Sequence, residues 1–216
     1  MFQYTTIPVT PFAQNCSIVW CSETMKAAII DPGGDLDLLL EAVKDLGVSL
    51  EQIWLTHAHI DHAGGTAELA SQLNIPIIGP QEEDQFWIDK LADQSRMFQF
   101  PLSRPFTPNR WLHDGDTVQI GHCVLDVRHC PGHTPGHVVF HSKEGQRAFV
   151  GDVLFAGSVG RTDFPRGDFD TLMSSIKERL WPMGNDTVFI PGHGPESTFG
   201  QERRSNPYVR DLQGAR

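Results

Sequence analysis

The sequence contains little cysteine and no long apolar run. Its 4 cysteines are Cys16, Cys21, Cys123 and Cys130. They form no CxxC pair, which argues against both a disulfide scaffold and a thiolate zinc site. No stretch approaches the ~18 consecutive apolar residues of a membrane span, and the N-terminus lacks the basic and apolar regions of a secretory signal. We therefore expect a reduced, cytoplasmic protein that does not act at membranes.

Basic residues are also scarce. The chain has 17 Lys and Arg against 27 Asp and Glu, and its formal net charge is -10. Because a nucleic-acid-binding protein needs a basic face to neutralise phosphates, we expect no nucleic-acid partner. An anionic small molecule is still compatible with this charge, since bound metal ions can reverse the local sign of a site. The GxSxG motif of serine hydrolases is missing too, so no serine nucleophile is expected.

Strand-like and helix-like segments alternate along the chain without a linker or a repeat. Apolar, β-branched and aromatic runs predict strands over residues 2–9, 15–21, 26–30, 53–55, 75–78, 117–120, 123–129, 137–141, 147–150 and 187–190. Apolar residues at helical spacing predict a helix capped by Asp35 and closed by Gly47, a second over residues 66–73, and a third capped by Asp170. Residues 80–112 are rich in aromatic residues with weak periodicity, which predicts a short helix and then a long loop over a site.

This order of elements divides into two similar halves. Each half should form a mixed sheet with helices on one side, so the expected fold is α/β, a four-layer αββα sandwich in one domain over residues 1–216. Strand ends in such a fold can bring distant polar residues to one edge of the sheets.

The segment THAHIDHAGG, residues 56–65, is the strongest candidate for a site. Alternate residues of an extended segment project to the same side, so His57 and His59 can bind one metal ion. The loop then turns at its two glycines, and Asp61 and His62 can serve a second ion nearby.

Four ligands from one loop would leave two ions incompletely coordinated. Three further candidates lie beside predicted strands, on loops stiffened by glycine or proline: His133 in HCPGHTPGH, Asp152 in VGDVLF and His193 in IPGHGP. Imidazoles and carboxylates are ligands that divalent transition metals accept, and a carboxylate can bridge two ions. These residues are therefore predicted as the remaining ligands.

With these residues in this order, the sequence resembles the metallo-β-lactamase superfamily. The resemblance rests on HxHxDH at residues 57–62, on the three later ligand candidates, and on the DPGG turn that begins at Asp31. It implies an αββα fold with a dinuclear centre at the edge of the sheets. One ion would be bound by His57, His59 and His133, and the other by Asp61, His62 and His193, with Asp152 bridging.

Further residues are expected to support this centre. The resemblance implies that Asp31 orients a ligand histidine by hydrogen bonding, and we expect His137 to support the site without binding metal. Two ions that share a water lower its pKa towards ~7, so the expected nucleophile is a metal-bridging hydroxide, which Asp61 would orient. The two divalent ions are expected to be zinc, with iron and manganese as alternatives.

Within the superfamily, the chain resembles short bacterial glyoxalase II, also called hydroxyacylglutathione hydrolase, down to the segment FAGSVGRTDFPRGD, residues 155–168. That thioesterase cleaves S-D-lactoylglutathione to D-lactate and glutathione. Few residues follow His193, so the C-terminal helical domain that holds glutathione in the full-length enzyme is not expected. Arg161, Arg166 and the aromatic loop of residues 98–111 are then the candidates for substrate contacts, and Arg161 fits a structural salt bridge equally well.

A persulfide dioxygenase is the alternative. These oxidoreductases also carry the GRTDF segment of residues 160–164 and use one iron, for which His57, His133 and Asp152 would be the ligands. The complete set of seven ligand residues favours a dinuclear hydrolase.

Nucleases of the superfamily carry an inserted domain and a basic surface that this sequence lacks. The absence of a secretory signal argues against a β-lactamase, and the retention of every ligand argues against a non-catalytic module.

Overall fold

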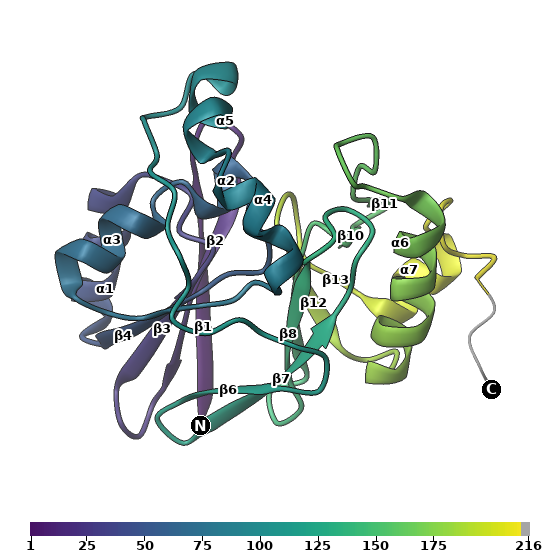
Figure 1. The fold of residues 1–216 in the computed structure, drawn as a ribbon. Coiled ribbons are helices and arrows are strands. Elements are labelled where there is room, and N and C mark those ends of the chain that lie inside the picture. The colour runs from purple at the N-terminus through teal and green to yellow at the C-terminus, as the bar shows by residue number, and fades with distance from the viewer. Residues whose placement is uncertain (213–216) are drawn as a thin grey trace.

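The computed structural model describes residues 1–212, which form two β-sheets packed face to face (Figure 1). The first sheet has the strand order β1 (Phe2–Val9), β2 (Gln14–Cys21), β3 (Lys26–Ile30), β4 (Ser49–Trp54) and β5 (Ile77–Ile78). The second sheet has the order β13 (Ser197–Thr198), β12 (Val188–Pro191), β9 (Arg147–Gly151), β8 (Val138–Ser142), β7 (Cys123–His129) and β6 (Thr117–Ile120). A separate hairpin consists of β10 (Leu154–Phe155) and β11 (Ser158–Val159).

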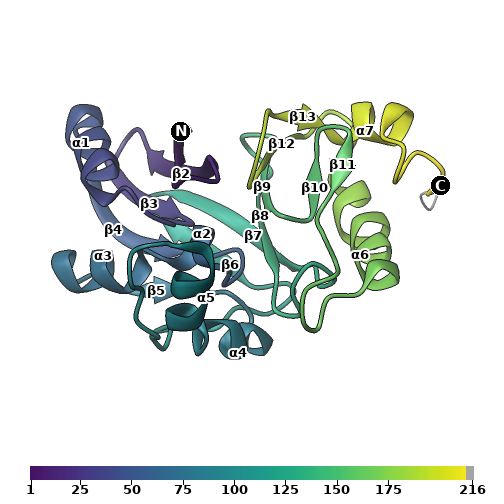
Figure 2. The ribbon, with the colours of Figure 1, turned by 90° about the horizontal axis from the view of Figure 1, so that it is seen from above.

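Helices flank the two sheets on the outside, which gives the predicted four-layer αββα sandwich (Figure 2). On the side of the first sheet lie α1 (Leu36–Leu46), α2 (Ile60–Ala63), α3 (Thr66–Leu73), the 3-10 turn η1 (Glu82–Asp84), α4 (Gln85–Ile88) and α5 (Leu91–Phe98). On the side of the second sheet lie α6 (Phe169–Ser175), the π-helical turn η2 (Ile176–Leu180), the 3-10 turn η3 (Trp181–Met183) and α7 (Phe199–Ser205). Across residues 1–212, no helix is both long enough and apolar enough to cross a membrane.

The alternation of side chains along the strands separates the core into layers. In β3, Ala27 and Ile29 pack with the helices of the first sheet, whereas Ala28 and Ile30 pack between the sheets. In β9, Phe149 lies between the sheets, and its neighbours on either side pack with α6 and α7. Strands buried on both faces must be apolar at nearly every position, which is why these runs were readable from the sequence.

Two parallel strand pairs determine where the site forms. β3 pairs in parallel with β4, and β9 pairs in parallel with β12. The carboxyl ends of each pair therefore meet at one edge of their sheet, and the residues shortly after these four ends are Asp31, His57, Asp152 and His193. A hydrogen bond from the Val138 N–H to the Thr56 carbonyl (2.8 Å) joins the two sheets beside this edge.

Two of the predicted helix caps are wrong in detail. Asp35 precedes α1, but its carboxylate accepts a hydrogen bond from the Thr10 N–H (2.7 Å) and makes no capping bond. The cap of α6 is Asp168 and not Asp170, because the Asp168 side chain accepts a hydrogen bond from the Thr171 N–H (2.8 Å). Several acidic residues stand near each helix start, and only the backbone path decides which carboxylate reaches the free N–H groups.

The aromatic segment of residues 80–112 contains more helix than predicted. The turn η1 and the helices α4 and α5 extend to Phe98, and the loop begins only there. Within this loop, Phe100, Phe106 and Trp111 pack into the core on the helical side of the first sheet instead of lying over a site. Short helices followed by a packed loop bury single aromatic residues at unequal spacing, so no helical period is visible.

Gly33, in the turn after β3, makes a close backbone contact with α2, which carries two of the predicted ligands. A Cβ at Gly33 would lie 1.5 Å from the Asp61 carbonyl oxygen, whereas at Gly34 the nearest atom would be the Thr10 methyl group at 3.2 Å. We predict that Gly33→Ala lowers the free energy of unfolding by about 3 kcal/mol, because backbone overlap is not relieved by a rotamer change. Gly34→Ala should cost less than about 1 kcal/mol. Urea denaturation compares the two variants, and equal stabilities would contradict this contact.

Candidate metal centre

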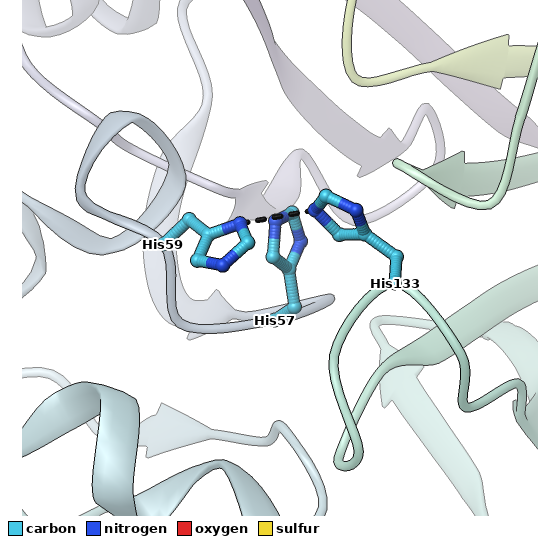
Figure 3. Close-up of side chains that lie close together, drawn as sticks. All are labelled: His57, His59 and His133. Carbon is cyan, nitrogen blue, oxygen red and sulfur yellow. Dashed lines mark hydrogen bonds between the residues drawn. The ribbon is translucent and has the colours of Figure 1, made fainter. Parts of the chain in front are cut away.

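The loop after β4 and the loop between β7 and β8 bring three histidines together, as Figure 3 shows. Nitrogens of His57, His59 and His133 all lie within 4.8 Å of one another, and the three side chains are buried. The Nδ1 atom of His59 lies 3.0 Å from the Nε2 atom of His133. Two ligands of a tetrahedral zinc ion are about 3.4 Å apart, so this separation is close to that of a metal site. We call these residues the first cluster.

A second cluster consists of Asp61, His62 and His193, whose potential ligand atoms also lie within 4.8 Å of one another. Asp61 and His62 belong to α2, whereas His193 follows β12 on the other sheet. The Oδ2 atom of Asp61 lies 3.1 Å from Nε2 of His193 and 3.8 Å from Nε2 of His62. The site therefore requires both halves of the fold.

Asp152 lies between the two clusters. Its Oδ1 atom is 3.3 Å from Nε2 of His62, and its Oδ2 atom is 3.5 Å from Nε2 of His133 and 3.8 Å from Nε2 of His193. One carboxylate thus faces ligands of both clusters, which is the position of a bridging ligand. All seven residues predicted as ligands come together in one centre.

Unpartnered atoms in this centre show that it fits a cation. Among the described residues, Nε2 of His57 is buried and makes no hydrogen bond; Nε2 of His62 and Oδ1 of Asp152 are also buried without a hydrogen bond and face each other at 3.3 Å. A buried polar atom without a partner costs free energy, and coordination of a metal would remove that cost. Imidazoles and carboxylates without thiolates suit zinc, iron or manganese. The residues present therefore fit a divalent transition metal.

Asp31 and Thr56 contact the Nδ1 atoms of two candidate ligands, His62 and His57, and so orient their rings. The Nδ1–H of His62 donates to Oδ2 of Asp31 (2.9 Å), which also accepts from the Thr56 hydroxyl (2.6 Å). The Thr56 N–H donates to Oδ1 of Asp31 (2.7 Å), and the Thr56 hydroxyl oxygen lies 3.0 Å from Nδ1 of His57. These contacts leave the Nε2 atoms of both histidines directed into the centre. The family resemblance implied an orienting role for Asp31, and its carboxylate accepts these hydrogen bonds from His62 and Thr56.

His137 stands behind the centre. Its ring stacks on that of His57 with centroids 4.7 Å apart and planes at 18°. Its Nε2 atom accepts a hydrogen bond from the Asp152 N–H (3.0 Å), so this nitrogen is turned to the backbone and not to a metal position. Of the other histidines among residues 1–212, His129 and His141 belong to neither cluster.

The electrostatics of the two clusters differ. Burial lowers the pKa of His57, His59 and His133, so these rings are neutral and able to bind a cation. Burial also disfavours charge on His62, but the carboxylates of Asp152 and Asp61 outweigh it and raise the pKa well above its usual range. The pKa of His193 is raised as well, because its hydrogen bond to Asp61 and the nearby Asp152 outweigh burial.

Two buried residues that no motif marks hold the ligand loops. Oδ2 of Asp84 accepts a hydrogen bond from the Ala58 N–H (3.0 Å), between two ligand histidines. Oε1 of Gln94 accepts from the Ile60 N–H (3.0 Å), and its amide group donates to the Trp87 carbonyl (3.0 Å). In a single sequence, one acid and one amide in an irregular segment look like surface residues.

The centre lies in a cleft with a volume of about 670 Å³. Its walls are largely apolar and include several aromatic rings; the ring centroids of Trp87 and Phe164 lie 4.6 and 4.9 Å from that of His59. Phe155 lines the opposite side, with its ring centroid 6.2 Å from that of His193. A concave, largely apolar cleft with a few polar groups suits a small organic molecule.

Of the two arginines predicted to contact substrate, one lines the cleft and the other does not. Arg161 lines the cleft, but Asp163 pairs with its guanidinium at 2.9 and 2.8 Å. Arg166 is not among the lining residues and donates to the Glu83 carbonyl (3.3 Å). Lys90, which belongs to no sequence motif, also lines the cleft, and its ammonium group lies 5.5 Å from the centre of the Phe86 ring.

The sequence and the fold have counterparts among known proteins. Residues 9–193 match the family model of the metallo-beta-lactamase superfamily, and the chain belongs to this superfamily. The chain is 45% identical over 204 residues to the hydroxyacylglutathione hydrolase GloC of Haemophilus influenzae, which covers 94% of this chain and 96% of GloC. It is 33% identical over 208 residues to the probable metallo-hydrolase YqgX of Bacillus subtilis, covering 96% of this chain and 97% of YqgX.

Two solved structures have a similar fold and are more than 30% identical to this chain. The BLEG-1 B3 metallo-beta-lactamase is 32% identical, with a TM-score of 0.88, and the match covers 96% of this chain and 99% of that one. TTHA1623 in a di-iron-bound form is 36% identical, with a TM-score of 0.87, covering 95% of this chain and all (100%) of that one. The chain is thus a hydrolase of the glyoxalase II-like subgroup, with residues suited to a divalent metal.

We predict that acidification removes metal from the second cluster before the first. Because the pKa values of His62 and His193 are raised, protons compete with metal there already above the usual histidine range. The pKa values of His57, His59 and His133 are lowered, so protons compete for them only at lower pH. Metal analysis after equilibration at stepwise lower pH should show one ion lost before the other. Loss of both in a single step would contradict this order.

Proposed function

We propose that this chain hydrolyses the thioester of S-D-lactoylglutathione to D-lactate and glutathione, with two divalent ions, zinc foremost, bound at the two clusters. The observation that carries the proposal is the carboxylate of Asp152, which faces both clusters in the cleft. The identity to GloC supports the choice of substrate, since GloC is a hydroxyacylglutathione hydrolase.

The bound ions would supply Lewis-acid polarisation of the thioester carbonyl and a water whose pKa is lowered towards ~7. The residues of the chain position the reactants around them. The Oδ2 atom of Asp61, which lines the cleft, would accept a hydrogen bond from the attacking water and orient it. Trp87 and Phe164, packed against His59, exclude solvent from one side of the carbonyl.

The cleft itself would hold the glutathione part of the substrate. Glutathione carries carboxylates, and the cations that line the cleft are Lys90 and Arg161. Asp163 already neutralises much of the Arg161 charge, so Lys90 is the better partner for a carboxylate. Arg161 acts mainly through its backbone, because its carbonyl accepts a hydrogen bond from Nδ1 of His133 (2.6 Å) and orients that ring.

Asp152→Ala should remove both metal and activity. The variant loses the cleft-lining carboxylate that faces both clusters, so kcat/KM for lactoylglutathione should fall by more than about 100-fold. Asp163→Ala changes an exposed carboxylate nearby and should leave the metal content unchanged. Metal analysis and thioester cleavage measure both effects. If Asp152→Ala retains two ions, Asp152 does not bridge.

Lys90→Ala should raise KM for lactoylglutathione by about 2- to 5-fold and leave kcat unchanged, as expected for an exposed ion pair. The lactoyl thioester of a neutral thiol such as N-acetylcysteamine has no glutathione carboxylates, so Lys90→Ala and the unaltered chain should cleave it equally well. Lys177→Ala, an exposed lysine on η2, is the control. An equal effect of Lys90→Ala on both thioesters would rule out a role in binding the glutathione carboxylates.

Three assays on the metal-loaded chain distinguish this proposal from its alternatives: thioester hydrolysis, persulfide-dependent oxygen uptake and β-lactam hydrolysis. We expect thioester hydrolysis with two ions per chain. One iron per chain with oxygen uptake and no thioester cleavage would overturn the proposal in favour of a dioxygenase. β-Lactam cleavage without thioester cleavage would overturn it in favour of a lactamase.

A further inference from the structure

Asp84 is a fully buried carboxylate that lies between the two ligand loops. It ends η1 and precedes α4, and its side chain is 0% exposed. Oδ2 accepts hydrogen bonds from the Ala58 N–H (3.0 Å) and the Thr134 hydroxyl (2.9 Å), and Oδ1 accepts one from the Gly136 N–H (2.6 Å). These donors are not ligands, but each lies within a few residues of one.

The donors come from opposite halves of the fold. Ala58 stands between His57 and His59 on the loop that leaves the first sheet, whereas Thr134 and Gly136 follow His133 on a loop of the second sheet. The first cluster consists of residues from these two loops, so its size depends on the distance between them. One carboxylate therefore connects the two loops whose separation sets the geometry of the first cluster.

The loop of His133 also packs directly on the segment of Asp84. A Cβ at Gly136 would lie 2.5 Å from the Gln81 carbonyl oxygen and 2.6 Å from the backbone nitrogen of Asp84. The Gln81 N–H donates to the Gly136 carbonyl (3.0 Å). The two backbones leave no room for a side chain at Gly136, so we expect a shift of Asp84 to move the loop as well.

The chemistry of the contact requires a carboxylate. Three donors and no acceptor converge on the side chain, and an amide would place its own N–H groups against one of them. Burial raises the pKa of Asp84 to about 7, which shows how costly a charge is at this position. A neutral or apolar residue would avoid this cost, so the carboxylate is explained by the bonds it accepts.

We propose that Asp84 is a positioning residue that holds the His57–His59 loop and the His133 loop at metal-binding distance, and so sets the affinity of the first cluster for its ion. This inference rests on the proposed dinuclear centre. Asp84 touches none of the second cluster, so its effect is confined to one of the two ions.

The test is the variant Asp84→Asn, which keeps the size of the side chain and removes acceptor capacity. Competition with a chelator should show one ion bound about 10- to 100-fold more weakly, the effect typical of residues that support metal ligands, and the other unchanged. The visible spectrum of the cobalt-substituted chain should change for the weakened ion only. A purely structural role would lower stability without altering either ion.

Glu202→Gln is the matched control. Glu202 is another buried carboxylate (2% exposed) with three donors, the Gly157 N–H, the Ser197 hydroxyl and the Asn206 amide, and it touches neither ligand loop of the first cluster. This variant should lose stability and keep the affinity and cobalt spectrum of the first ion.

If Asp84→Asn does not fold, Thr134→Val removes one of the three hydrogen bonds at constant shape and should weaken the same ion by a smaller factor. A folded variant that binds both ions as tightly as the unaltered chain overturns the positioning role and leaves the dinuclear hydrolase intact. An unaltered chain that binds no ions, or binds two and cleaves no thioester, overturns the proposed function instead.

Discussion

The centre depends on burying charged groups that only each other or a cation can neutralise. Asp152 is 8% exposed, and an isolated carboxylate at this depth costs several kcal/mol. The charged rings of His62 and His193 offset that cost when no metal is bound, which is why their pKa values rise. A divalent cation can take the same role. The first cluster contains no carboxylate of its own, so its rings stay neutral and available as ligands.

The fold makes this arrangement rigid. Parallel strand pairs in both sheets end at one edge, and the loop that follows β4 is fixed by hydrogen bonds that its N–H groups donate to Asp31, Asp84 and Gln94. Apolar and aromatic side chains then surround the histidine and aspartate side chains at the base of the cleft. Fewer water molecules reach the base of such a cleft, so the electrostatic interactions of a polarised carbonyl are stronger there than in bulk solvent. Ligand orientation and the low-polarity environment therefore result from the same packing.

Most strands were predictable from the sequence, and the candidate ligands could be selected from residue type and spacing. Strands such as β3 and β9 are apolar on both faces because both faces are buried, and this leaves a continuous signal. The helix of residues 66–73 was predicted with its observed bounds. The predictions failed where a side chain chooses between partners distant in the sequence. Asp35 bonds to Thr10 and not to its own helix, and the first turn of α6 is capped by Asp168 and not by Asp170.

The sequence by itself determined the superfamily, the layered architecture and the seven candidate ligands, because metal chemistry restricts both residue type and spacing. Asp31 and His137 were expected as supporting residues as well, but only the tertiary structure identified the others. Asp84, Gln94 and Lys90 have no distinctive neighbours in the chain, and their surroundings come from segments far away in sequence. The two clusters, likewise, have different charge only because the folded chain places Asp61 and Asp152 beside His62. A pattern along the chain records local spacing, whereas burial and electrostatics are properties of the three-dimensional environment.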